Sequence, residues 1–276
     1  MQFGVFAKTY PGKQPHGSLA AAAADGYATV QYNMACSGLA SMPLEIPSNV
    51  AEEVRQASRE TGVTLCGLSA TYNMIHPDRA VREAGHASFR VLAAQARDMG
   101  TDLLTLCTGT RHPDDQWAWH ADNATPTAWR DLRESLDVIL PIAHEFDLHL
   151  GIEPELANVV NSAKAARRLL DETGSPRLRI VFDPANLFEV ETIDDQRTIM
   201  SHGFDLLGDD IVIAHAKDRQ ADGSFTTAGN GVLDYRHFIR GLSAIGFDGP
   251  LVTHGLAAED AGNVRRFLQR ALEDAD

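Results

Sequence analysis

The sequence Leu148-His149-Leu150-Gly151-Ile152-Glu153-Pro154-Glu155 lies near the middle of the 276-residue chain and carries its clearest strand signal. Its first residues alternate apolar side chains with others, which is typical of a β-strand. The proline after Glu153 cannot donate a backbone hydrogen bond, so strand pairing should stop there. Glu153 is therefore predicted to be an acid at the end of a strand, directed into a loop region.

The same design recurs three times further along the chain. Arg179-Ile180-Val181-Phe182-Asp183-Pro184 is an apolar run that ends in an acid and a proline. Two later runs, Ile211-Val212-Ile213-Ala214-His215 and Pro250-Leu251-Val252-Thr253-His254, each end in a histidine. Packing alone does not explain four successive strands that all end in a side chain of the metal-binding type. The candidates for a shared site are Glu153, Asp183, His215 and His254.

Strands alternate with helices along the whole chain, in eight units. Such alternation favours parallel pairing, and eight units match a closed (β/α)8 TIM barrel of the α/β class. An open doubly wound sheet is the alternative, but no GxGxxG sequence follows the first strand. We expect a single domain over residues 1–276, because no break in composition or linker interrupts the pattern. Strands are expected at 3–6, 28–32, 63–68, 103–107, 148–152, 179–182, 211–214 and 250–253. Helices are expected at 19–24 after a Ser18 cap, 48–61, 78–99, 125–146, 162–172, up to about 207, 235–245 and 259–273.

Composition narrows the classes of function. The formal net charge of −14 and the lack of a dense basic run argue against a nucleic-acid partner. No apolar run has the length of a membrane span, and the first residues lack the basic and apolar parts of a signal peptide. Three cysteines without a CxxC pair indicate reduced thiols. We expect a cytoplasmic protein with neither a membrane nor a nucleic-acid partner.

Four segments resemble the sugar phosphate isomerase/epimerase family, the xylose isomerase-like TIM barrels. They are Gly151-Ile152-Glu153-Pro154, Phe182-Asp183-Pro184-Ala185-Asn186, His215-Ala216-Lys217-Asp218 and Gly229-Asn230-Gly231-Val232-Leu233-Asp234. The resemblance covers essentially the whole chain. In that family one divalent metal is typically held by Glu, Asp, His and Glu at the ends of strands five to eight. The resemblance therefore implies Glu153, Asp183 and His215 as metal ligands.

The chain departs from the family pattern at its last ligand position, where His254 stands in place of the expected glutamate. His254 is predicted either to bind the metal as a neutral imidazole or to serve with Glu153 as the second acid/base. Two carboxylates and two imidazoles suit several divalent ions. We expect one ion, manganese before zinc, iron or cobalt.

The resemblance implies an isomerase or epimerase that acts on a small keto-sugar, sugar phosphate or related polyol. Proton transfer by Glu153 would pass through a metal-stabilised enediolate. One alternative is a metal-dependent lyase, a dehydratase of an inosose-like or keto-acid substrate, because elimination needs one base and one acid and His254 suits the acid. Another, of a different class, is a catalytically degenerate barrel that binds a metabolite.

Further candidates for substrate binding lie in the loops that follow the strands. Lys217 and Arg219 could hold a phosphate or carboxylate, or form solvated pairs with nearby aspartates. Trp117 could stack on a sugar as part of a lid, or contact a second copy in a homodimer. Each of the others could equally be structural, and Glu155 suits a loop salt bridge better than a ligand role. The predicted substrate-binding residues are Asn73, His76, Arg111, Trp117, Asn158, Asn186, Lys217 and Arg219.

Overall fold

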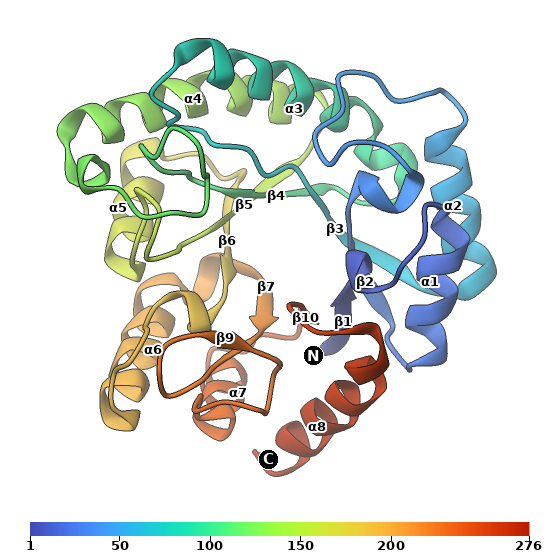
Figure 1. Ribbon diagram of the computed structural model, residues 1–276, viewed down its shortest axis with the longest axis vertical. Helices are drawn as coiled ribbons and strands as arrows, with labels where there is room; N and C mark the ends of the chain where they lie inside the picture. Colours follow the sequence, from blue (N-terminus) through green and yellow to red (C-terminus); the bar gives the residue numbers. More distant parts are fainter. Residues whose placement is uncertain (276) are drawn as a thin grey trace.

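The computed structural model describes residues 1–275, in which eight parallel strands close into a barrel ringed by helices (Figure 1). The order around the barrel is β1-β10-β7-β6-β5-β4-β3-β2, so the first strand closes it by pairing with both β10 and β2. This confirms the predicted (β/α)8 fold. The barrel strands are β1 (Gln2–Phe6), β2 (Thr29–Tyr32), β3 (Thr64–Ser69), β4 (Leu103–Cys107), β5 (His149–Glu153), β6 (Leu178–Phe182), β7 (Ile211–Ala216) and β10 (Pro250–Thr253).

The helices surround the barrel in chain order (Figure 1). Several start where the sequence places a cap: Asp78, Thr125 and Ser162 each accept a hydrogen bond from a backbone N–H of the first turn. The helices are α1 (Pro15–Ala24), α2 (Val50–Thr61), α3 (Arg79–Met99), α4 (Pro126–Glu145), α5 (Ala163–Thr173), α6 (Ile193–Leu207), α7 (Tyr235–Ala244) and α8 (Ala261–Glu273).

The predicted start of the first helix is wrong. Helix α1 begins at Pro15, whose fixed φ suits the first helical position. Ser18 lies inside the helix, where its hydroxyl donates to the carbonyl of Pro15 at 3.1 Å. The alanine run pointed to a helix, and the proline three residues earlier is the signal for its true start.

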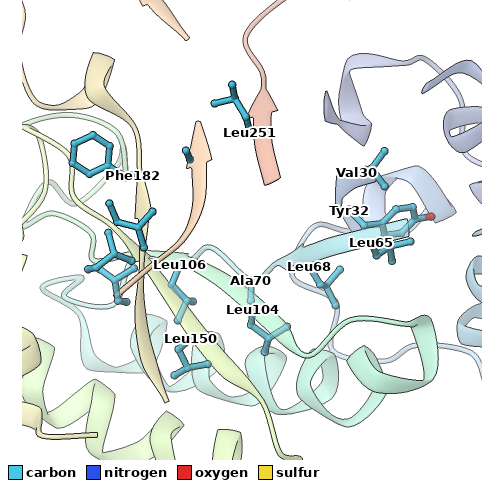
Figure 2. Packing of buried hydrophobic residues seen from close by; sticks show 14 of the residues in the cluster. Val30, Tyr32, Leu65, Leu68, Ala70, Leu104, Leu106, Leu150, Phe182 and Leu251 are labelled. Atoms are coloured by element: carbon cyan, nitrogen blue, oxygen red, sulfur yellow. The ribbon is translucent and has the colours of Figure 1, made fainter. Parts of the chain in front are cut away.

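The main core lies between the barrel and its helices. Residues such as Leu104, Leu150 and Phe182 point outward from the strands and pack under the helices (Figure 2). A smaller cluster of Leu103, Val181, Ile213 and Val252 is formed by residues of four barrel strands. Gly151 leaves room for it, because a Cβ there would stand 2.9 Å from Cγ2 of Val181. Strand alternation therefore directs every second residue into the barrel.

A short antiparallel hairpin follows β7 and was not predicted. Strand β8 (Asp218–Arg219) pairs with β9 (Phe225–Thr226), with Arg219 opposite Phe225. The buried carboxylate of Asp218 anchors the next loop by accepting hydrogen bonds from the backbone N–H groups of Gly229, Gly231 and Leu233, at 3.0–3.1 Å. This contact ties the glycine-rich loop to the segment around Asp218.

Replacing Gly231 with alanine should destabilise the protein by about 1–3 kcal/mol. A Cβ at this position would overlap the carbonyl oxygen of Arg219 and the carboxylate of Asp218. The free energy of unfolding in urea measures the effect. Gly17→Ala is the matched control: Gly17 lies in α1 with no atom within 4 Å of its added Cβ, so stability should be unchanged or rise by up to about 1 kcal/mol. Equal stability of both variants would contradict the anchoring role.

Within residues 1–275, no helix is both long and apolar enough to cross a membrane.

Candidate metal centre and substrate pocket

The carboxyl ends of the barrel strands surround a pocket of about 580 Å³. Because inward-facing residues alternate along each strand, the last inward residue of a strand lies at the edge of this pocket. Glu153 ends β5, His215 lies near the end of β7, and His254 follows β10. Asp183 follows β6, and its side chain is fully buried.

The four predicted ligands come together at the mouth of the barrel. One ligand atom from each of Glu153, Asp183, His215 and His254 lies within 4.8 Å of all the others. Nδ1 of His215 is 3.1 Å from Oε1 of Glu153, and Nε2 of His254 is 3.3 Å from Oδ2 of Asp183. The two imidazole rings lie 4.6 Å apart, centroid to centroid.

This donor set fits a divalent ion. Bonds from such an ion to nitrogen or oxygen are about 2.0–2.2 Å long, so two ligand atoms on one ion lie at most about 4.4 Å apart. The observed spread of up to 4.8 Å therefore needs only small side-chain movements. Two oxygens and two nitrogens suit manganese, iron, cobalt or zinc.

Asp183 is held by groups on both of its oxygens. Oδ1 accepts a hydrogen bond from the N–H of Ala185 at 2.9 Å, and Oδ2 lies 3.3 Å from Nζ of Lys217. Burial opposes ionisation of Asp183, but the charge of Lys217 and the contact with His254 outweigh it, so the pKa of this carboxyl lies well below its ordinary value. Asp183 is therefore ionised at neutral pH, and its Oδ2 lies 3.3 Å from Nε2 of His254 in the cluster.

The contacts of His215 fix which of its nitrogens faces the cluster. The side-chain nitrogen of Gln31 donates to Thr105 at 3.0 Å, which leaves Oε1 of Gln31 to accept from Nε2 of His215 at 2.7 Å. Nδ1 then faces the carboxylate of Glu153. Two lone pairs at this separation need a cation between them, either a proton or a metal ion. Gln31 thus leaves Nδ1 of His215 as the nitrogen that could bind a metal ion.

Charge is distributed unequally over the cluster. Burial disfavours the ions of both Glu153 and His215, but each stabilises the charge of the other, so the pKa of Glu153 is lowered and that of His215 is raised. Burial lowers the pKa of His254, and the charges of His215 and Lys217 add to the effect. His254 is therefore poised as a neutral imidazole, the form that binds metals.

Replacing Gln31 with leucine should weaken metal binding by about 10- to 100-fold, the usual cost of losing a partner that orients a ligand. Leucine cannot accept the hydrogen bond from Nε2 of His215, so the other ring tautomer becomes accessible. Competition with a chelating dye measures the affinity. Gln56→Leu, at an exposed position of α2, is the control and should bind as the wild type does. Unchanged affinity in the Gln31 variant would contradict the tautomer assignment.

Glu155 lies in the same pocket, although we predicted a loop salt bridge for it. Burial and the nearby charge of Glu153 raise the pKa of Glu155 to about 7. The thiol of Cys107 donates to its Oε1 at 2.8 Å. No ion pair of Glu155 occurs in the described part of the chain, so the predicted salt bridge is wrong: the loop turns this carboxylate inward instead of toward a surface cation.

The predicted substrate residues divide into two groups. Asn186, Lys217, Arg219 and Trp117 line the pocket. Nδ2 of Asn186 donates to Oε1 of Glu153 at 2.7 Å, and its Oδ1 accepts from Nζ of Lys217 at 2.6 Å. Lys217 and Arg219 are both buried, so the alternative of solvated pairs with aspartates is wrong for them.

The residues of the second group do not line the pocket. Their side chains form hydrogen bonds within the protein, mostly to the backbone of loops. Asn73 donates to the carbonyl of Thr110 at 2.8 Å and accepts from its N–H at 3.0 Å. Arg111 donates to Asp131 at 2.7 Å. Because these side chains are occupied by the loop backbone or by a buried aspartate, we correct their assignment to structural roles. The group consists of Asn73, His76, Arg111 and Asn158.

Among the pocket residues that the sequence analysis missed, two contact its charged or polar groups. Gln31 faces inward from β2 beside His215, and Phe225 packs against the cations of Lys217 and Arg219. The alternation Thr29-Val30-Gln31 could have indicated the first, because a polar residue on the inward face near a strand end lies at the barrel mouth. Phe225 carries no such signal, since its place depends on the hairpin.

The fold agrees with what known proteins show. A family model described as xylose isomerase-like TIM barrel matches residues 19–271. The chain belongs to this family. None of the curated proteins matches it in sequence.

Solved xylose isomerase-like barrels superpose on nearly the full chain at low identity. The 3-keto-D-glucoside 4-epimerase of E. coli is 15% identical with a TM-score of 0.77, over 98% of this chain and 99% of that one. D-psicose 3-epimerase is 16% identical with a TM-score of 0.77, over 99% of each chain. A xylose isomerase-like TIM barrel/4-hydroxyphenylpyruvate dioxygenase fusion protein is 18% identical with a TM-score of 0.77, and this chain spans only 43% of its length. These likenesses establish the fold, and the first two proteins are sugar epimerases.

Proposed function

We propose that the protein is a metal-dependent isomerase or epimerase of a small keto-sugar or related polyol. The observation that supports this most is the convergence of Glu153, Asp183, His215 and His254 at the mouth of the barrel. A divalent ion bound there would act as a Lewis acid on a carbonyl and a neighbouring hydroxyl of the substrate. The family membership and the sugar epimerases among the structural neighbours agree with this chemistry.

In this proposal, Glu153 and His254 would act on opposite faces of a substrate. In the barrel order, β5 and β10 are separated by β6 and β7, so their last residues approach the site from two sides. Glu153 removes the proton next to the carbonyl, and Asn186 holds its Oε1 in position. His254 either completes the ligand set as a neutral imidazole or, when it does not bind the ion, takes up a proton from solvent and gives it to the other side of the substrate.

The test is exchange of substrate hydrogen with D2O, followed by NMR. The manganese-loaded protein is incubated with D-psicose, D-fructose, L-ribulose, their phosphates and keto-acid sugars. Deuterium at the carbon next to the carbonyl, together with an isomer or epimer as product, is the expected result. A dehydrated product would replace the proposal by a lyase. Metal binding without exchange on any member of the panel would overturn catalysis in favour of a metabolite-binding barrel.

A further inference from the structure

Arg219 is a buried cation without a carboxylate partner. Two arginines are buried within residues 1–275, Arg82 with 8% and Arg219 with 6% of its surface exposed. Nη1 of Arg82 lies 3.3 Å from the carboxylate of Asp131. Arg219 has no such ion pair among the described residues, and carboxylates such as Glu189 act on its pKa only through charge at longer range.

Backbone and aromatic groups hold the guanidinium of Arg219 in place. Nε donates to the carbonyl oxygen of Ala185 at 2.6 Å, and Nη1 donates to that of Gly223. Its Cζ lies 3.9 Å from the ring centroid of Phe225, its cross-strand neighbour in the β8–β9 hairpin. A guanidinium has five N–H groups. The remaining three have no protein acceptor among residues 1–275, and the side chain borders the pocket.

A buried guanidinium with three unpaired N–H groups is energetically unfavourable unless a ligand accepts hydrogen bonds from them. Burial of a charge is unfavourable by several kcal/mol when no opposite charge compensates it. Burial accordingly lowers the pKa of Arg219. A planar guanidinium whose hydrogen bonds are incomplete matches the two oxygens of a carboxylate or phosphate in a bidentate contact.

Lys217 extends this positive surface toward the metal centre. Its Nζ lies 3.8 Å from the same ring centroid of Phe225 and 3.3 Å from Oδ2 of Asp183. Arg219 and Lys217 thus both lie against the ring of Phe225, and Lys217 is also in contact with Asp183 of the metal cluster. A substrate a few carbon atoms long can therefore reach both.

We propose that Arg219, assisted by Lys217, binds an anionic oxygen group at one end of the substrate, either a carboxylate or a phosphate. The inference rests on the proposed function and deepens it, because it assigns the substrate to acidic keto-sugars or sugar phosphates. The structural neighbours named above as epimerases of a 3-keto-D-glucoside and of D-psicose act, by these names, on uncharged sugars.

The binding test uses calorimetry of the metal-loaded protein with inorganic phosphate and with glycolate. At least one of the two should bind, and Arg219→Gln should weaken its binding by about 10- to 100-fold. Arg55→Gln, at an exposed position of α2, makes the same change in net charge and should have no effect. Arg219→Lys keeps the charge but loses the fork, so its binding should be intermediate. It also keeps the test valid if the glutamine variant does not fold. Failure of both anions to bind, or equal binding by the wild type and both Arg219 variants, would overturn the proposal.

Turnover distinguishes the two sources of the anion and separates this inference from the proposed function. D-Fructose is compared with D-fructose 6-phosphate and with 5-keto-D-gluconate. A preference of 10-fold or more in kcat/KM for one charged sugar, lost in Arg219→Gln mainly through KM, identifies phosphate or carboxylate. Equal use of uncharged ketose by wild type and variant, with no preference for either charged sugar, overturns the inference and leaves the isomerase standing. If the variant loses anion binding but no sugar is turned over, the inference stands and the proposed isomerase is overturned.

Discussion

Asp183→Ala should remove the metal ion from the barrel mouth. The Asp183 side chain is fully buried, and its Oδ2 lies 3.3 Å from both Nζ of Lys217 and Nε2 of His254, which lower the pKa of the carboxyl against the opposing effect of burial. Loss of an outer partner alone costs about 10- to 100-fold in metal affinity, and loss of a charged ligand should cost more. Elemental analysis of the purified wild type should find one transition metal ion per chain, and analysis of the variant should find none.

Two further variants make this result interpretable. Asp183→Asn keeps the acceptor for the N–H of Ala185 but lacks the charge, so it should also lose the metal while it folds normally. Asp205→Ala removes an exposed carboxylate from α6 and should keep the ion. A full equivalent of metal in both Asp183 variants would refute the proposed centre. Absence of metal from the wild type, even after manganese is added, would do the same.

Glu153→Gln should lower the rate of substrate proton exchange by about 10²- to 10⁴-fold. Glutamine keeps the shape of the side chain and an oxygen that can accept from Asn186, but it cannot take a proton from carbon. The rate is measured by deuterium incorporation at saturating manganese. Substrate affinity should be nearly unchanged, so the loss should appear in kcat.

The metal content of the Glu153 variant must be measured in the same samples, because Glu153 is also a proposed ligand. Glu134→Gln changes an exposed carboxylate of α4 and is expected to leave the rate unaltered. A Glu153 variant that holds its metal and exchanges protons at the wild-type rate would rule out Glu153 as the base. If the Glu153 variant lacks metal, excess manganese should restore metal binding but not the rate of proton exchange.

Much of the fold follows from local patterns. A short apolar run indicates each strand, and Pro154 and Pro184 mark where β5 and β6 end. The cap residues Asp78 and Ser162 directly precede the first residues of α3 and α5. The β8–β9 hairpin could not be predicted, because a two-residue strand is too short to show a period. The start of α1 was misplaced although Pro15 marks it.

The sequence by itself determined the barrel and the convergence of Glu153, Asp183, His215 and His254, because parallel strands bring their carboxyl ends to one face whatever their loops do. Only the tertiary structure decided which loop side chains are free to meet a substrate. Asn73 is tied to Thr110, 37 residues away, whereas Arg219 is buried with no carboxylate among the described residues to pair with. Such partners depend on the distance between loops, and strand and helix periodicity carries no information about that distance.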